Sequence, residues 1–221
     1  EPIRNGDFNY NELGKRITSN WDVNLFSTYA STEMGVAFTE CEFSVGGHHH
    51  PELIILEVLD ENKNIVEEGE VGEVVVTTLG VEGMPLIRYR TGDLCSVHYS
   101  SCKCGRTTTR LGPVVGRKQQ MIKFKGTTIF PPAIFDVLEM FAEITIYQVE
   151  ISKNEYGNDN ITIILSDELR SKEFENKLIS LFRSKLRVTP LLRFENEVEL
   201  NKKVISEKKR KPEKIIYLNY D

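Results

Sequence analysis

Four residues of types that bind soft metal ions occur as two short pairs in this sequence. Cys41 and His48 form the first pair, and Cys102 and Cys104 flank a single lysine in the second. Three thiolates and one imidazole are a tetrahedral ligand set that suits Zn²⁺, and four protein ligands leave no open position, so such a metal would be structural. The alternatives are four unlinked side chains or redox chemistry at the Cys-x-Cys pair. His50 is a second candidate for the imidazole ligand.

A second set of residues has the types needed to hold a nucleotide. Tyr29-Ala30-Ser31-Thr32-Glu33 comes first, 85–93 (PLIRYRTGD) follows, and Gly116-Arg117 comes last. A carboxylate can accept hydrogen bonds from two ribose hydroxyls, an aromatic ring can cover adenine, and cations stabilise phosphate charge. Each motif alone is common. Their joint occurrence in this order resembles the signatures of the phenylacetate–coenzyme A ligase family of adenylate-forming enzymes.

The resemblance implies a role for each matching residue. Tyr29 would lie against adenine, Thr32 would contact the α-phosphate, and Glu33 would hold Mg²⁺. Asp93 would bind the ribose hydroxyls, and Arg117 would reach the ribose or a phosphate. In the family, ATP activates a carboxylic acid as its acyl-AMP, and the acyl group then passes to coenzyme A. Some relatives carry cysteines and a histidine equivalent to those above and bind zinc with them.

The C-terminal part of the sequence also matches this superfamily. A lysine in a Ser-Glu-Gly-Lys motif there neutralises charge on the α-phosphate, and Ser206 to Lys209 (SEKK) stands in its place. Lys209 is the positional match, Lys208 and Lys211 are the other candidates, and a solvated basic tail is the alternative. Gly126 matches a loop that faces the active site when the thioester forms, although a plain turn is equally consistent with it.

Two positions depart from the family pattern. Ala30 stands where glycine is usual, and a positive φ there would strain an alanine by about 1–2 kcal/mol. Gln119 stands at the hinge position, where aspartate is usual. The second change bears on how the small domain would move between its two poses.

The elements that must position these residues fall into two parts. In the first part we predict a helix at 9–20 and strands at 21–27, 52–60, 73–78, 86–90 and 94–99. In the second we predict strands at 121–124, 144–151, 160–165 and 191–195, helices at 132–141 and 171–186, and a basic tail at 202–214.

The β-α-β-β-α-β order of the second part is typical of a small domain with helices on one side of an antiparallel sheet. We therefore predict an α/β (α+β) protein. Residues 1–117 would be the β-rich C-terminal portion of the AMP-binding domain, and 118–221 a small mobile domain.

The composition is that of an ordinary globular protein, with 28% charged and 40% apolar residues. The net charge of −5 gives no electrostatic reason to bind nucleic acid or an anionic membrane. No apolar run approaches the ~20 residues that span a bilayer, and no signal peptide is visible. We expect a cytoplasmic protein with reduced cysteines, Cys95 being a core residue.

The sequence lacks the Ser/Thr/Gly-rich loop that cradles ATP phosphates in this superfamily. We therefore expect the chain to be the C-terminal half of a longer acyl-CoA ligase and to be inactive alone. The expected partners are ATP, an aryl or arylacetic acid and coenzyme A, and a homodimer is compatible with the sequence. The alternatives are an adenylating enzyme that acylates an amine or carrier protein, and a non-catalytic module stabilised by zinc.

Overall fold

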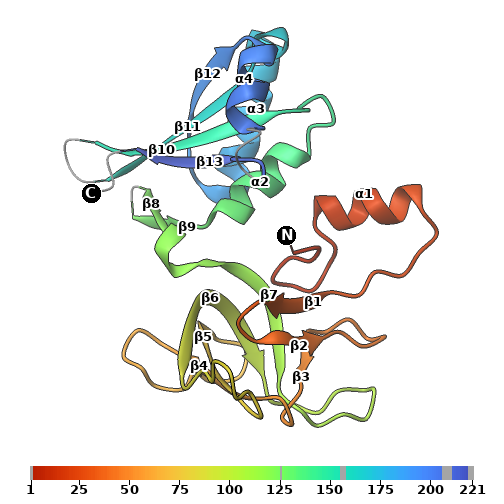
Figure 1. Ribbon diagram of the computed structural model, residues 1–221. Coiled ribbons are helices and arrows are strands. Elements are labelled where there is room, and N and C mark those ends of the chain that lie inside the picture. Colours follow the sequence, from red (N-terminus) through yellow and green to blue (C-terminus); the bar gives the residue numbers. More distant parts are fainter. Residues whose placement is uncertain (1, 125, 155–157, 206–210, 219–221) are drawn as a thin grey trace. The chain divides into compact units, whose positions relative to one another are not determined.

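The computed structural model describes residues 2–124, 126–154, 158–205 and 211–218. The chain divides into two compact units, Glu1–Gln120 and Met121–Asp221 (Figure 1). This division follows a 3₁₀ turn at Lys118–Gln120, so it lies three residues beyond the predicted boundary at residue 117. Within the described residues, none of the helices has the length and apolar character needed to cross a bilayer.

The first unit is a seven-stranded sheet preceded by one helix. Its elements are α1 (Glu12–Asn20), β1 (Thr28–Ser31), β2 (Gly35–Thr39), β3 (Gly47–His49), β4 (Ile54–Leu59), β5 (Val71–Thr78), β6 (Tyr89–His98) and β7 (Arg110–Arg117). The strand order is β1-β2-β3-β7-β6-β5-β4, and every neighbouring pair is antiparallel. Alternate residues of β5 and β6, such as Val74, Val76, Cys95 and Val97, are buried together in one core.

Two strand predictions in this unit were wrong. Residues 21–27 form no strand, and β1 begins only at Thr28. Apolar side chains alternate there, but Trp21 remains 69% exposed, because no neighbouring strand pairs with the segment. The strands predicted at 86–90 and 94–99 are one strand, β6, whose pairings with β5 and β7 shift register. The motif 89–93 therefore lies within a bulged strand.

The second unit is a four-stranded sheet with helices and a separate hairpin. Its elements are β8 (Ile122–Phe124), β9 (Thr127–Ile129), α2 (Pro131–Glu139), β10 (Tyr147–Lys153), β11 (Asp159–Ser166), a 3₁₀ turn (Asp167–Leu169), α3 (Lys172–Leu186), β12 (Leu191–Glu195), α4 (Glu197–Val204) and β13 (Ile215–Leu218). The sheet order is β12-β11-β10-β13, and β8 pairs only with β9. This mixture of helices and sheet agrees with the predicted α/β (α+β) class.

The prediction of an antiparallel sheet covered on one side was wrong in two respects. β10 and β11 are antiparallel, but β11 pairs in parallel with β12, and β10 in parallel with β13. The helix α3 is the crossover that a parallel β11–β12 pair requires. Helices also cover both faces. α2 and α3 pack on the side of Ile163, whereas Leu200 of α4 packs against Ile164, whose side chain points to the opposite face.

The described residues at the two ends of the segment predicted as a basic tail, 202–214, adjoin regular elements. Lys202 and Lys203 form the last turn of α4, where cations interact favourably with the helix dipole. The chain then returns to the sheet as β13. Asn196 caps the start of α4 by accepting a hydrogen bond from the Val198 amide at 3.1 Å. The first two lysines of the predicted tail are therefore part of a short amphipathic helix, Glu197–Val204.

We predict that truncating the buried side of α4 will destabilise the protein. Leu200→Ala removes a fully buried side chain and should lower the free energy of unfolding by about 2–5 kcal/mol, measured by denaturant titration. Val198→Ala is the matched control, because Val198 is 62% exposed in the same helix and should change stability by less than about 0.5 kcal/mol. Equal effects of the two substitutions would show that α4 does not pack on the sheet as described.

Candidate functional site

Asp93 lies at the centre of a small hydrogen-bonded group in the first unit. The Tyr29 hydroxyl donates to Asp93 Oδ2 at 2.7 Å, and Arg117 Nε donates to Asp93 Oδ1 at 2.9 Å. Asp93 and Arg117 face each other across β6 and β7, so the antiparallel register sets this pair. Tyr29 comes from β1, and three strands separate β1 from β6 in the sheet order. The sheet must therefore curl to bring the phenol to the carboxylate.

The neighbours of these residues hold them in place. The ring of Tyr29 stacks on Phe38 of β2, with centroids 5.7 Å apart and an interplanar angle of 24°. The Asp93 amide donates to Thr91 Oγ1 at 3.1 Å, and the Thr91 hydroxyl donates to a backbone carbonyl of β5 at 2.9 Å. Between them Gly92 has a φ of +76°, a conformation that glycine adopts without strain. This local kink in β6 sets the direction of the Asp93 carboxylate.

The Tyr29 phenol is held in its neutral, hydrogen-donating form. Burial raises the pKa of Tyr29 well above its ordinary value, and the Asp93 carboxylate beside it acts in the same direction, while a hydrogen bond with Thr91 opposes them. A neutral phenol keeps its proton, so the Tyr29 hydroxyl can donate to the Asp93 carboxylate across the physiological pH range.

Thr32 and Glu33 are exposed in the turn that joins β1 to β2. Hydrogen bonds from its own backbone amide and from the Ser31 side chain lower the pKa of Glu33, and the positive charge of Arg117 contributes. The turn therefore presents a hydroxyl and an ionised carboxylate near the Asp93 group. The strain considered for Ala30 does not arise, because Ala30 lies in β1 and is not among the described residues with positive φ.

A second charged group next to this site was not predicted from the sequence. Glu73 of β5 is buried and forms an ion pair with Arg90, whose Nε donates to Glu73 Oε1 at 3.1 Å. Lys118 also contacts Glu73, with Nζ 3.4 Å from Oε2. These cations lower the pKa of Glu73, mainly through the hydrogen bond from Arg90. The only signal in the sequence was an isolated glutamate at the start of an apolar strand.

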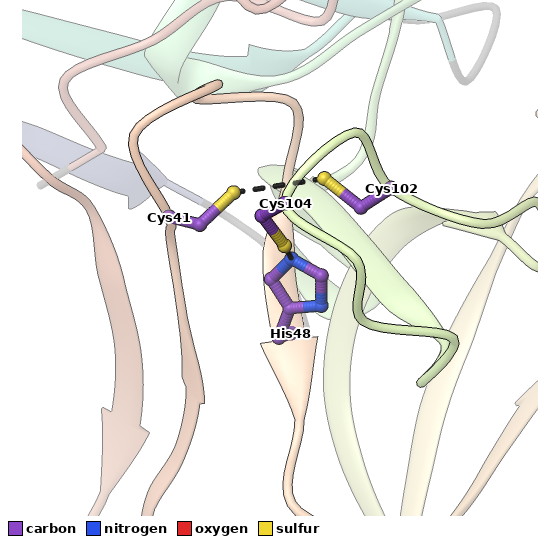
Figure 2. Close-up of side chains that lie close together, drawn as sticks. All are labelled: Cys41, His48, Cys102 and Cys104. Carbon is purple, nitrogen blue, oxygen red and sulfur yellow. Dashed lines mark hydrogen bonds between the residues drawn. The ribbon is translucent and has the colours of Figure 1, made fainter.

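Cys41, His48, Cys102 and Cys104 come together at one end of the first unit (Figure 2). Their ligand atoms all lie within 4.8 Å of one another. The sulfur atoms of Cys41 and Cys102 are 3.6 Å apart, and Cys104 Sγ is 3.4 Å from His48 Nε2. A tetrahedral centre with Zn–S bonds of about 2.3 Å places its sulfur atoms about 3.8 Å apart. The donor types and their spacing therefore fit a zinc ion.

The state of each donor is consistent with metal binding. All four cysteines are free thiols. Burial lowers the pKa of His48, with contributions from the charges of Arg106 and Arg110, so the imidazole is held neutral as a ligand must be. Burial raises the pKa of Cys41, whereas a backbone hydrogen bond from Arg106 leads the effects that lower the pKa of Cys104. Cys104 is thus more readily ionised for a metal than Cys41.

The neighbouring candidates lie outside this cluster. His50, the second candidate ligand, contacts Thr39 Oγ1 and Glu52 Oε1, each at 3.2 Å. His49 Nε2 lies 2.8 Å from the backbone carbonyl of Ile54. Cys95 is fully buried among apolar side chains, as expected for a core residue.

The predicted residues of the second unit are only partly described. Gly126 lies in the turn between β8 and β9 with a φ of +83°, and open space surrounds the position of a Cβ atom there. Lys209, with its neighbour Lys208, lies outside the described residues. Lys211 is described and is exposed shortly before β13. The structure therefore does not test the choice among these lysines.

Comparison with known proteins gives two similar relatives of the same name. A phenylacetate-coenzyme A ligase from Thermus thermophilus is 34% identical over 146 residues, which cover 64% of this chain and 33% of the relative. One from Pseudomonas putida is 31% identical over 172 residues, which cover 73% of this chain and 36% of the relative. Over these residues the chain resembles the phenylacetate–coenzyme A ligases. It spans about a third of the length of these relatives. No family model matches the sequence.

Solved structures show a similar fold. A 2-hydroxyisobutyryl-CoA ligase in the postadenylation state, in complex with R3-HIB-AMP, superposes with a TM-score of 0.79 at 21% identity. The match covers 95% of this chain and 46% of that protein. At this level of identity the likeness is one of fold, and the fold is the mixed α/β arrangement of adenylate-forming enzymes.

We predict that Tyr29 stays protonated at pH values where ordinary tyrosines ionise. Because its folded-state pKa is raised, its contribution to stability is complete below pH ~10, the pKa in the unfolded chain, and is lost as the pH rises further. Absorbance titration at 295 nm of the folded wild type and Tyr29→Phe should give nearly the same phenolate signal at pH ~10. The denatured forms should differ by about half a tyrosine at that pH, because a phenol with a pKa of ~10 is half ionised there. A difference of that size between the folded forms would contradict the prediction.

Proposed function

We propose that the protein is an ATP-dependent acid–thiol ligase that activates a carboxylic acid as its acyl-AMP and transfers the acyl group to coenzyme A. The observation that carries the proposal is the convergence of Tyr29 and Arg117 on Asp93, beside the Thr32-Glu33 turn. Similarity to relatives that bear the name phenylacetate-coenzyme A ligase adds support. A structural neighbour that holds an acyl-AMP type of ligand has the same fold.

The proposed roles follow from the chemistry of each side chain. Asp93 accepts hydrogen bonds from the ribose hydroxyls, because its two oxygens have lone pairs beyond those used by Tyr29 and Arg117. Tyr29 presents an aromatic face to adenine. Thr32 contacts the α-phosphate, and the ionised Glu33 holds Mg²⁺, an ion that prefers oxygen ligands.

The second unit supplies the remaining proposed roles. Lys209 carries the cation that neutralises charge building on the α-phosphate, a task suited to a compact ammonium group. Gly126 lets the backbone pass close to the coenzyme A thiol, since no side chain occupies the space around it. An aryl or arylacetic acid is the proposed substrate, in keeping with the names of the relatives. A cytoplasmic location is proposed as well, because none of the four cysteines forms a disulfide bond.

Two alternatives differ from this proposal in the reaction that they predict. An adenylating enzyme that acylates an amine or a carrier protein would share the first half-reaction. Gln119, at the position where the family usually has aspartate, is compatible with this alternative. A non-catalytic module stabilised by zinc would form no adenylate. ATP–pyrophosphate exchange by the full-length protein, with aryl, arylacetic and aliphatic acids, separates the last reading from the others. Exchange without thioester formation on addition of coenzyme A would favour the amine or carrier acceptor.

We predict that Asp93→Asn will raise the KM for ATP in the exchange assay by about 10- to 100-fold, because a charge-assisted hydrogen bond to each ribose hydroxyl is weakened. Glu57→Gln is the matched control. Glu57 is also a carboxylate on this sheet, but it lies on β4, which β5 separates from the strand of Asp93. It accepts two hydrogen bonds from Arg88, each 3.0 Å long. An unchanged KM in Asp93→Asn would show that the Asp93 carboxylate does not bind the nucleotide.

We propose further that Cys41, His48, Cys102 and Cys104 bind a structural zinc ion. The support is their tetrahedral donor set, its spacing and the neutral form of His48. With four protein ligands the ion has no position for a substrate. Its effect would be to tie the loop around Cys41 to the loop that holds Cys102 and Cys104.

We predict that the purified protein carries one zinc ion per chain and melts at a lower temperature in a strong chelator. Structural zinc sites contribute about 10–16 kcal/mol in small domains. Elemental analysis should show that Cys104→Ser loses the metal and that Cys95→Ala, which alters a buried core cysteine, keeps it. Protein that holds no metal, and melts at the same temperature with and without chelator, would rule out the site.

A further inference from the structure

One short segment, residues 106–110, borders the metal cluster with three side chains. Arg106 Nη1 lies 3.7 Å from Cys104 Sγ. Thr108 Oγ1 lies 3.2 Å from His48 Nδ1. Arg110, the first residue of β7, faces His48 in the antiparallel register of β7 and β3. Three residues of one loop and strand start therefore lie around the same centre.

The Thr108 contact determines which imidazole nitrogen faces the metal position. An imidazole that donates its Nδ1 proton to the Thr108 hydroxyl leaves Nε2 as the lone-pair nitrogen. Nε2 is the atom that lies 3.4 Å from Cys104 Sγ, on the cluster side of the ring. Hydrogen bonds of this kind fix both the tautomer and the ring orientation of metal-binding histidines.

Arg110 is a buried arginine whose hydrogen-bond acceptors carry no negative charge. Its side chain is 6% exposed, and its hydrogen bonds go to neutral oxygens, the Val45 carbonyl at 2.6 Å and the Ser100 carbonyl and hydroxyl at 3.0 and 3.1 Å. No carboxylate forms an ion pair with it within the described residues, and its Nε has no hydrogen-bond partner. A buried guanidinium without a counter-charge is strongly unfavourable.

The metal cluster provides the missing negative charge. Three thiolates and one Zn²⁺ sum to a centre with one net negative charge, since the imidazole is neutral. Arg106 lies against one of its sulfur atoms, and Arg110 lies opposite its histidine. With the metal bound, the buried Arg110 and the negatively charged cluster would each offset the cost of burying the other.

We propose that Arg106, Thr108 and Arg110 form the outer layer of the metal centre. In this layer Thr108 positions the His48 imidazole, the buried Arg110 balances the net negative charge of the metal–thiolate group, and the exposed Arg106 adds positive charge beside a sulfur atom. The inference rests on the proposed zinc site. All three are positioning residues, because none of them binds the metal.

The test measures the zinc affinity of the folded protein by competition with a chromophoric chelator. Arg106→Gln and Thr108→Val should each raise the Kd for zinc by about 10-fold or more, as changes next to metal ligands do. Two matched controls lie in the same loop. Lys103→Gln removes one positive charge from an exposed position between the two cysteines, and Thr107→Val removes an exposed hydroxyl next to Thr108. Both should stay within about 2-fold of the wild type.

Conservative substitutions separate positioning from general damage to the loop. Thr108→Ser keeps the hydroxyl and should restore the wild-type Kd, whereas Thr108→Val should not. Equal Kd values for Arg106→Gln, Thr108→Val and the two controls would overturn the inference while leaving the zinc site intact. A wild-type protein that takes up no zinc at all would instead overturn the zinc site itself.

Arg110 has its own readout. Removing the metal from the wild type leaves the buried Arg110 without a negative partner. Removing it from Arg110→Met leaves no such buried charge. The chelator-induced fall in melting temperature should therefore be smaller in Arg110→Met than in the wild type. An equal or larger fall contradicts the role of Arg110, and if this variant does not fold, the affinities of the Arg106 and Thr108 variants decide the inference.

Discussion

The hydrogen-bonded pairing of β6 with β7 supports both candidate sites of the first unit. At one end of this pair the register places Asp93 opposite Arg117. At the other end it places His98 opposite Arg110, and the connection between the two strands carries Cys102 and Cys104. A slip of one residue would turn every side chain of a strand to the other face. It would separate Asp93 from Arg117 and would also move the cysteine loop away from its partners.

Curvature of the sheet is the second requirement. The Tyr29 hydroxyl reaches Asp93 although β1 and β6 are not neighbours in the sheet. Bulges in β5, β6 and β7 shift the register at Glu73 and around Cys95, and bulges increase the local twist and bend of strands. The irregular pairings thus have a function in the fold, since they direct the sheet so that its first strand approaches its middle.

Charge is distributed around these sites in compensated groups. Asp93 has Arg117, and the buried Glu73 has both Arg90 and Lys118. Lys118 belongs to the 3₁₀ turn at which the first unit ends, so its contact with Glu73 ties the start of the connection to the sheet. Gln119, at the position where the sequence predicts a hinge, lies beside Gly92, with its Oε1 atom 3.6 Å from where a Gly92 Cβ would be.

The sequence by itself determined what depends on residue type and local pattern. The long helix at 172–186, the apolar strands, the metal-binding character of three cysteines and a histidine, and the order of the nucleotide-binding motifs all follow from short-range information. Tertiary structure decided the rest. It placed His48, and not His50, beside the three cysteines, brought Tyr29 to Asp93, and folded Glu197–Val204, with its two lysines, into the helix α4. These outcomes depend on contacts between segments far apart in the chain. Periodicity and composition do not predict such contacts, because the free energy that stabilises the contacts comes from packing and strand pairing in three dimensions.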